Sequence, residues 1–154
     1  MFKKIFLTIF TVCILSLPLF GAPAAIKDGS VITIALDGQR FQLEAANSDK
    51  SRVRGLSGRE KMPHDGMIFF FDQPQKLVFW MKDMNFPIDI IWVKDDKVIG
   101  FEQNAPAQPD TADYLLRKYF SPAESDVVIE LNSGDVKKFN IKEGTILKYQ
   151  EMTK

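Results

Sequence analysis

The sequence is nearly devoid of cysteine and histidine, with one Cys and one His among 154 residues. Zinc sites are built mainly from these two residue types, so we expect no zinc centre. The single cysteine, Cys13, lies in an N-terminal apolar run that we expect to be removed. Disulfides and a catalytic thiol are therefore excluded for the remaining chain.

The sequence also has no excess of charge of either sign. It carries 20 Lys and Arg against 20 Asp and Glu. A general nucleic-acid-binding protein needs a basic surplus to neutralise phosphates, so we expect no nucleic-acid partner. Gly-x-Ser-x-Gly, the phosphate-binding loop and the dinucleotide fingerprint are all missing, which disfavours serine hydrolysis and nucleotide chemistry. We expect no cofactor.

The N-terminus has the pattern of a secretory signal. Lys3 and Lys4 precede an apolar run over residues 5–20, and Ala22-Pro23-Ala24 resembles a cleavage site. We expect residues 1–24 to be cleaved, which predicts a periplasmic or extracellular protein with no stable membrane span. A retained membrane anchor is the alternative, since the apolar run approaches the ~20 residues needed to cross a bilayer.

The rest of the chain, residues 25–154, shows no repeat or linker and is expected to form a single domain. Runs rich in β-branched and aromatic residues alternate with turn signals and predict about eight strands. We predict a mostly β fold, an antiparallel sandwich or barrel-like sheet, with Asp37-Gly38 and Lys94-Asp95-Asp96 as hairpin turns. The predicted strands are Val31–Leu36, Arg40–Ala45, Met67–Phe71, Leu77–Met81, Ile88–Val93, Lys97–Phe101, Asp126–Leu131 and Thr145–Tyr149.

Two or three short helices are expected between these strands. They are Ser48–Leu56, Thr111–Tyr119 and Ser133–Phe139. Each of the two serines is expected to cap its helix by accepting hydrogen bonds from the first backbone amides. Residues Glu102–Asp110 contain two prolines and are predicted to form a surface loop.

Four motifs in the middle of the chain occur in a characteristic order and spacing, and a fifth closes the domain. The sequence resembles the DUF192 family, a domain of unknown function, over about Phe41 to Lys148. The resemblance implies a mostly β, sandwich-like domain that is commonly exported in bacteria, with no established activity, cofactor or catalytic residue. The motifs are Arg54-Gly55-Leu56-Ser57-Gly58-Arg59, Gly66-Met67-Ile68-Phe69-Phe70-Phe71, Phe79-Trp80-Met81-Lys82, Pro87-Ile88-Asp89-Ile90-Ile91, and Asn132-Ser133-Gly134 followed by Ile141-Lys142-Glu143-Gly144.

Asp89 is the most informative residue in these motifs. It shares one face of a predicted strand with Ile91 and Val93, and both faces of that strand are apolar enough to be buried. A buried carboxylate needs a partner. One interpretation is a structural ion pair with Arg54 or Arg59, and the other is a carboxyl group that exchanges protons in catalysis.

The cations of the motifs suggest a binding pocket. Arg54, Arg59 and Lys82, placed beside Trp80 and Asp89, would form a cationic pocket with an aromatic wall. Such a pocket suits a small anionic molecule or a glycan. The sequence thus favours an exported accessory protein of the cell envelope that binds such a ligand or an envelope protein.

Two other functions stay open. A carboxylate pair, Asp89 with Asp83 or Glu102, could hydrolyse an envelope glycan as general acid and base. Met62, His64 and Met67 combine thioether and imidazole ligands, which suit cuprous copper in an exported protein.

Overall fold

The computed structural model describes residues 26–150, so the predicted signal peptide and Cys13 lie outside the described residues. The described chain forms nine strands, two short helices, α1 (Asp49–Arg54) and α2 (Asp135–Lys138), and one 3₁₀ turn, η1 (Asp113–Leu115). None of its helices is long and apolar enough to cross a membrane. The strands are β1 (Val31–Leu36), β2 (Gln39–Ala46), β3 (Gly66–Gln75), β4 (Val78–Trp80), β5 (Ile88–Lys94), β6 (Lys97–Ala105), β7 (Lys118–Phe120), β8 (Ser125–Asn132) and β9 (Leu147–Tyr149).

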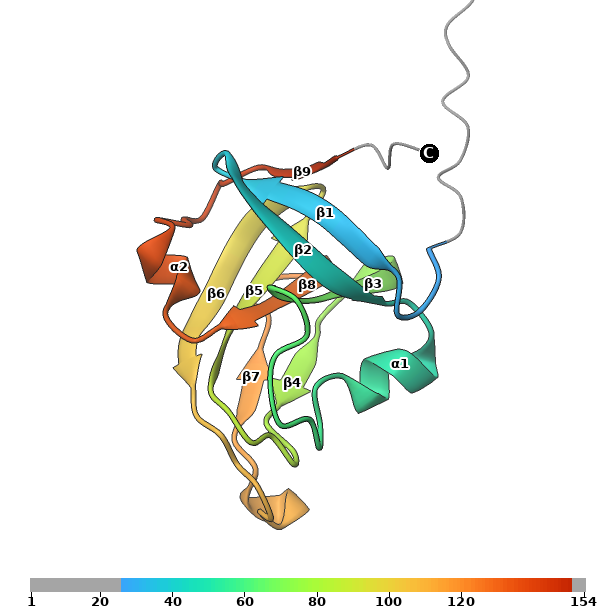
Figure 1. Cartoon of the computed structure of the whole chain (residues 1–154), viewed down its shortest axis with the longest axis vertical. Coiled ribbons are helices and arrows are strands. Elements are labelled where there is room, and N and C mark those ends of the chain that lie inside the picture. The colour runs from blue at the N-terminus through green and yellow to red at the C-terminus, as the bar shows by residue number, and fades with distance from the viewer. Residues whose placement is uncertain (1–25, 151–154) are drawn as a thin grey trace, which may run out of the picture.

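Seven of these strands form one curled sheet in the order β6-β5-β8-β3-β2-β1-β9, while β4 and β7 pair separately (Figure 1). The two edges of the large sheet meet. The Val98 amide donates to the Thr145 carbonyl at 2.9 Å, and the Leu147 amide donates to the Asp96 carbonyl at 2.8 Å. The predicted mostly β, barrel-like fold is confirmed, and its pairs are antiparallel except for β2 with β3.

Both predicted hairpins are present. Asp37 and Gly38 connect β1 to β2 with φ values of 48° and 81°. Asp95 and Asp96 connect β5 to β6 with φ values of 49° and 58°, and Lys94 is the last residue of β5. Two consecutive positive φ values give the turn the twist that an antiparallel pair requires.

The central strands are buried on both faces, which creates two cores. In β5, Ile91 and Val93 face the inside of the barrel, whereas Ile88, Ile90 and Trp92 belong to an outer core. The outer core is covered by the segment from α1 to β3 and by the β4–β7 pair. The prediction that both faces of β5 are buried is confirmed.

Asp89 lies on the inner face of β5, is fully buried, and fastens α2 to the barrel. Its carboxylate accepts hydrogen bonds from the amides of Asn104 at 2.8 Å, Gly134 at 3.1 Å and Val136 at 2.9 Å. The predicted ion pair of Asp89 with Arg54 or Arg59 is wrong. Backbone amides from β6 and from the start of α2 satisfy the carboxylate instead.

The helix predictions were correct in part. Ser48 caps α1 as expected, through a capping box with Ser51. Ser133 does not cap α2, because its hydroxyl donates to Asn104 Oδ1 at 2.6 Å. The Asp89 carboxylate accepts the Val136 amide at the start of α2 instead. The predicted helix over residues 111–119 is wrong: only η1 forms there, and the chain then extends as β7 to pair with β4. The predicted loop starts later than expected, since β6 runs to Ala105.

Replacing Asp89 tests its role in fastening α2. Asp89→Ala leaves three amides of the protein interior without their acceptor, and we expect it to lower the free energy of unfolding by about 3 kcal/mol or more. Urea unfolding of the two proteins measures this difference.

Asp28→Ala is the matched control, because Asp28 also accepts backbone amides at a helix start but lies at the surface. We expect it to cost less than Asp89→Ala. An Asp89→Ala protein as stable as the wild type would show that the carboxylate does not hold α2.

Candidate ligand-binding pocket

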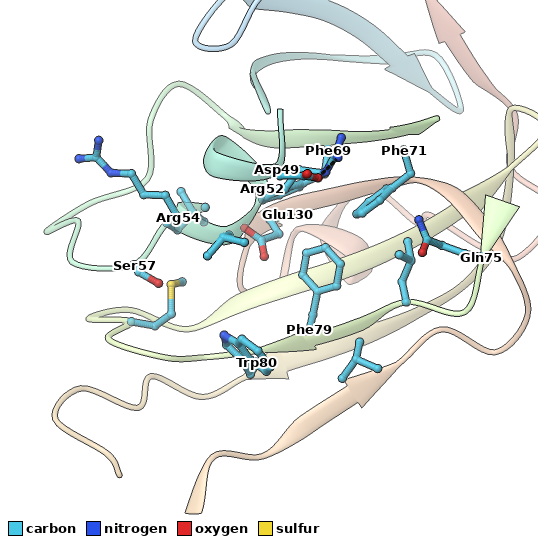
Figure 2. Close-up of a pocket in the computed structure, with 16 residues that line it drawn as sticks. Asp49, Arg52, Arg54, Ser57, Phe69, Phe71, Gln75, Phe79, Trp80 and Glu130 are labelled. Carbon is cyan, nitrogen blue, oxygen red and sulfur yellow. Dashed lines mark hydrogen bonds and ion pairs between the residues drawn. The ribbon is translucent and has the colours of Figure 1, made fainter. Parts of the chain in front are cut away.

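A pocket of about 350 Å³ opens between α1 and β4, on the outer face of the barrel (Figure 2). Its floor comes from β3 and β8, one wall from α1 and the turn after it, and the other wall from β4 and the residues before it. Four aromatic side chains and one glutamate dominate its lining, so we refer to it as the aromatic pocket. These residues are Phe69, Phe71, Phe79, Trp80 and Glu130.

The wall formed by α1 is fixed by hydrogen bonds to two other segments. The Asp28 carboxylate accepts the Asn47 amide at 2.7 Å and both serine hydroxyls of the capping box, and these bonds hold the pKa of Asp28 far below its usual range. Arg52 donates to the carbonyl oxygen of Phe70 at 2.7 Å. The helix start is therefore anchored to the N-terminal segment and its middle to β3.

The aromatic rings pack against one another around the pocket. Phe69 and Phe79 meet edge to face, with ring centres 5.4 Å apart. The Arg52 guanidinium lies 5.0 Å from the centre of the Phe71 ring. Trp80 is 48% exposed at the rim, so one face of its indole is free to contact a ligand.

Glu130 is the unusual group of the pocket. Only 5% of it is exposed, and its Oε2 is fully buried without a hydrogen-bond partner among residues 26–150. Burial raises the pKa of the Glu130 carboxyl to about 8, although the Arg59 guanidinium opposes the rise. At neutral pH the carboxyl group in the pocket is thus mostly protonated.

The sequence analysis did not identify Glu130. The signal was present, since Glu130 interrupts the apolar run of residues 127–131, in which β8 is buried on both faces. Strand alternation places Glu130 with Val128 on the outer face, opposite Met67 of β3 and Ile90 of β5. Because a single glutamate in a strand is commonly exposed, its burial could be seen only once α1 and β4 covered this face.

The five residues predicted to bind a ligand do not lie together. Arg54 and Trp80 line the aromatic pocket. Arg59 makes two hydrogen bonds to Glu44, at 2.6 and 2.9 Å, which lower the pKa of the Glu44 carboxyl.

The other two predicted residues are also engaged elsewhere. Lys82 pairs with Asp113 at 2.6 Å, and Asp89 lies on the opposite face of the sheet. Of the three predicted cations, only Arg54 makes no ion pair within the described residues. Its guanidinium extends away from the pocket in Figure 2.

The carboxylates of the proposed hydrolase are separated from the aromatic pocket. Both carboxylate oxygens of Asp89 accept hydrogen bonds from structural backbone amides. Glu102 pairs with Arg117 at 3.1 Å, and Asp83 is exposed at the turn before β5. The two acids that do line this pocket are Glu130 and Asp49, and Asp49 is paired with Arg52.

The predicted copper ligands differ strongly in exposure. Met67 is buried in the outer core and Met62 packs against it, whereas His64 is exposed and has a φ of 47°. Between residues 26 and 150, no group of three His, Cys, Asp or Glu side chains could hold a metal ion.

Comparison with known proteins agrees with the fold. A family profile, DUF192, described as Uncharacterized ACR, matches residues 32–149. The chain belongs to the DUF192 family. No curated protein matches this DUF192 chain.

Two crystal structures resemble this DUF192 domain. One, from Sinorhizobium meliloti, is described as a candidate transcription regulator; it is 25% identical, with a TM-score of 0.68, over 80% of this chain and 97% of its own. The other, from Novosphingobium aromaticivorans, is a protein of unknown function; it is 26% identical, with a TM-score of 0.65, over 77% of this chain and 84% of its own.

The free energy of unfolding should depend on whether Glu130 is protonated. The pKa of about 8 in the folded protein lies above the ordinary glutamate value of 4.5, so the folded state is favoured while the carboxyl is protonated. The contribution of Glu130 to the free energy of unfolding is fully present below pH 4.5. It is lost as the pH rises to about 8, which lowers the free energy of unfolding by on the order of 5 kcal/mol.

Glu130→Gln removes this titration. We expect the variant to become progressively more stable than the wild type between pH 5 and pH 8, as measured by urea unfolding at each pH. Two stability curves that run parallel over this range would show that Glu130 is not buried in the way described.

Proposed function

We propose that this DUF192 protein is an exported accessory protein of the cell envelope that binds a small organic ligand in the aromatic pocket. The observation that carries the proposal is the buried Glu130 carboxyl, which has no hydrogen-bond partner in the described part of the chain and lies in the same pocket as the half-exposed Trp80. A mostly apolar pocket with a few polar groups is the usual form of a small-molecule site. Since a buried polar group without a partner costs stability, its presence here favours a functional role.

The proposal of export rests on the N-terminal pattern of residues 1–24, with its two lysines, apolar run and Ala-x-Ala site. A periplasmic or extracellular location follows from it. The balanced charge favours a small ligand over nucleic acid. We therefore do not propose transcription regulation, the role named for the Sinorhizobium neighbour, for this chain.

Of the two expected ligand classes, the geometry supports a glycan better than a small anion. An anion would need cations, and Arg59 and Lys82 already pair with Glu44 and Asp113. A sugar needs a flat aromatic surface and a polar group, which Trp80 and Glu130 supply. The pocket volume of about 350 Å³ is within the range of small-molecule sites.

Hydrolysis is the second candidate function, because of one property of Glu130. A carboxyl group kept protonated near neutral pH by an apolar site is suited to act as a general acid. Its partner would have to be Asp49, the other acid of the pocket, which pairs with Arg52 at the rim. Turnover of a glycan that is lost in Glu130→Gln would favour this function over binding alone.

The binding role of the pocket can be tested with two aromatic residues of the same small sheet. Trp80 lines the pocket, whereas Phe120 does not, although it is 64% exposed. We expect Trp80→Ala to weaken ligand binding about tenfold, the value of one aromatic stacking contact, and Phe120→Ala to leave it unchanged.

The measurement is the rise in thermal unfolding midpoint with cellobiose, N,N′-diacetylchitobiose, glucuronate, phenol and choline as probes. Any ligand that binds only the folded protein raises this midpoint. Equal effects of Trp80→Ala and Phe120→Ala on every responding probe, or no response to any probe, would contradict the proposed function.

A further inference from the structure

The inner part of the aromatic pocket contains one ionisable group that is not already paired. Asp49 and Arg52, which also line the pocket, form an ion pair with each other at 2.5 Å. Arg54 is exposed and extends away from the pocket (Figure 2). Glu130 alone lies inside, with one oxygen fully buried and neither oxygen hydrogen-bonded to the described residues.

The surroundings of Glu130 favour positive charge. The faces of aromatic rings carry partial negative charge and attract cations. One ring of this pocket already does so, because the Arg52 guanidinium lies 5.0 Å from the centre of Phe71. Phe69, Phe79 and Trp80 surround the remaining space together with the Met84 thioether.

We infer that the aromatic pocket binds an organic ammonium ion, whose charge pairs with the Glu130 carboxylate while its carbon atoms pack against the surrounding rings. The inference rests on the proposed function, because it names the ligand class for the same pocket. An organic anion would face an acidic group with no free cation beside it. A neutral ligand could hydrogen-bond to the protonated Glu130 carboxyl but would form no ion pair with its ionised form.

None of the charged groups around Glu130 already provides the cation that we infer for the ligand. Arg59 approaches it from the turn after α1 but is held by two hydrogen bonds to Glu44. Arg52 and Asp49 face the pocket from α1 and neutralise each other. The strands on either side of β8 place apolar residues next to Glu130. No cation within the described part of the chain therefore forms an ion pair with Glu130.

Proton release should accompany binding of such a ligand. Glu130 is mostly protonated at neutral pH, since its pKa is about 8, and it must lose its proton to pair with an ammonium group. The affinity for a permanently charged cation should therefore rise with pH and level off once Glu130 is ionised. A neutral ligand of the same shape should show no such dependence.

Choline and 3,3-dimethylbutan-1-ol provide this comparison, because they have nearly the same shape and differ in charge. Titration calorimetry of the exported protein should show choline binding at least tenfold more tightly at pH 8 than at pH 6, as expected for ionisation with a pKa of about 8. Binding of 3,3-dimethylbutan-1-ol should be equal at the two pH values.

Two glutamate variants test whether Glu130 causes the pH dependence of choline binding. Glu130→Gln should bind choline at both pH values as weakly as the wild type does at pH 6. Glu60→Gln makes the same substitution at an exposed residue that forms no ion pair within the described chain, and it should behave as the wild type. Urea unfolding confirms that each variant is folded, and Trp80→Ala should weaken choline binding independently of pH.

The outcomes separate this inference from the proposed function. Choline that binds no better than 3,3-dimethylbutan-1-ol at pH 8, or a pH effect that persists in Glu130→Gln, overturns the assignment of an ammonium ligand. If the neutral probe or a glycan still binds and Trp80→Ala weakens it, the proposed function stands without this inference. If no probe binds at all, both are wrong.

Discussion

Burial of the central strands on both faces is the constraint on which the rest of this structure depends. The inner faces of β3, β5 and β8 fill the barrel, and their outer faces need a second cover. Short elements, α1 and the β4–β7 pair, cover these outer faces. The aromatic pocket lies in the gap between α1 and β4. The pocket is therefore a consequence of how the outer core is closed, and Glu130 lies in it because β8 alternates between the two cores.

Two buried acids in adjacent strands, Asp89 in β5 and Glu130 in β8, differ in their hydrogen-bond partners. Asp89 receives three backbone amides and serves the structure, since it fastens α2 to the barrel. Glu130 receives no hydrogen bond from the residues that the structure describes, and burial raises the pKa of its carboxyl to about 8. A group that lowers stability without a structural benefit is a reasonable candidate for ligand recognition.

The sequence predicted what depends on local patterns and missed what depends on distant segments. The turn at Asp37-Gly38, the cap at Ser48 and the two-sided burial of β5 follow from residue type and spacing, and all are present. The sequence pattern predicts a helix where β7 forms, because its partner β4 lies about 40 residues away in the chain. The partners of Asp89 and Arg59 come from distant segments, α2 and β2 among them, and the burial of Glu130 depends on the segments that cover it, so local patterns do not indicate them.

The central claim is that the Glu130 carboxyl is buried in the aromatic pocket without a partner among residues 26–150. The most direct test is an NMR titration of its side-chain carboxyl carbon, with Glu130→Gln used to assign the signal. The structure predicts a titration midpoint near pH 8. A midpoint near the ordinary glutamate value of 4.5 would show that the carboxyl is solvated or paired, and would contradict a buried, unpaired Glu130.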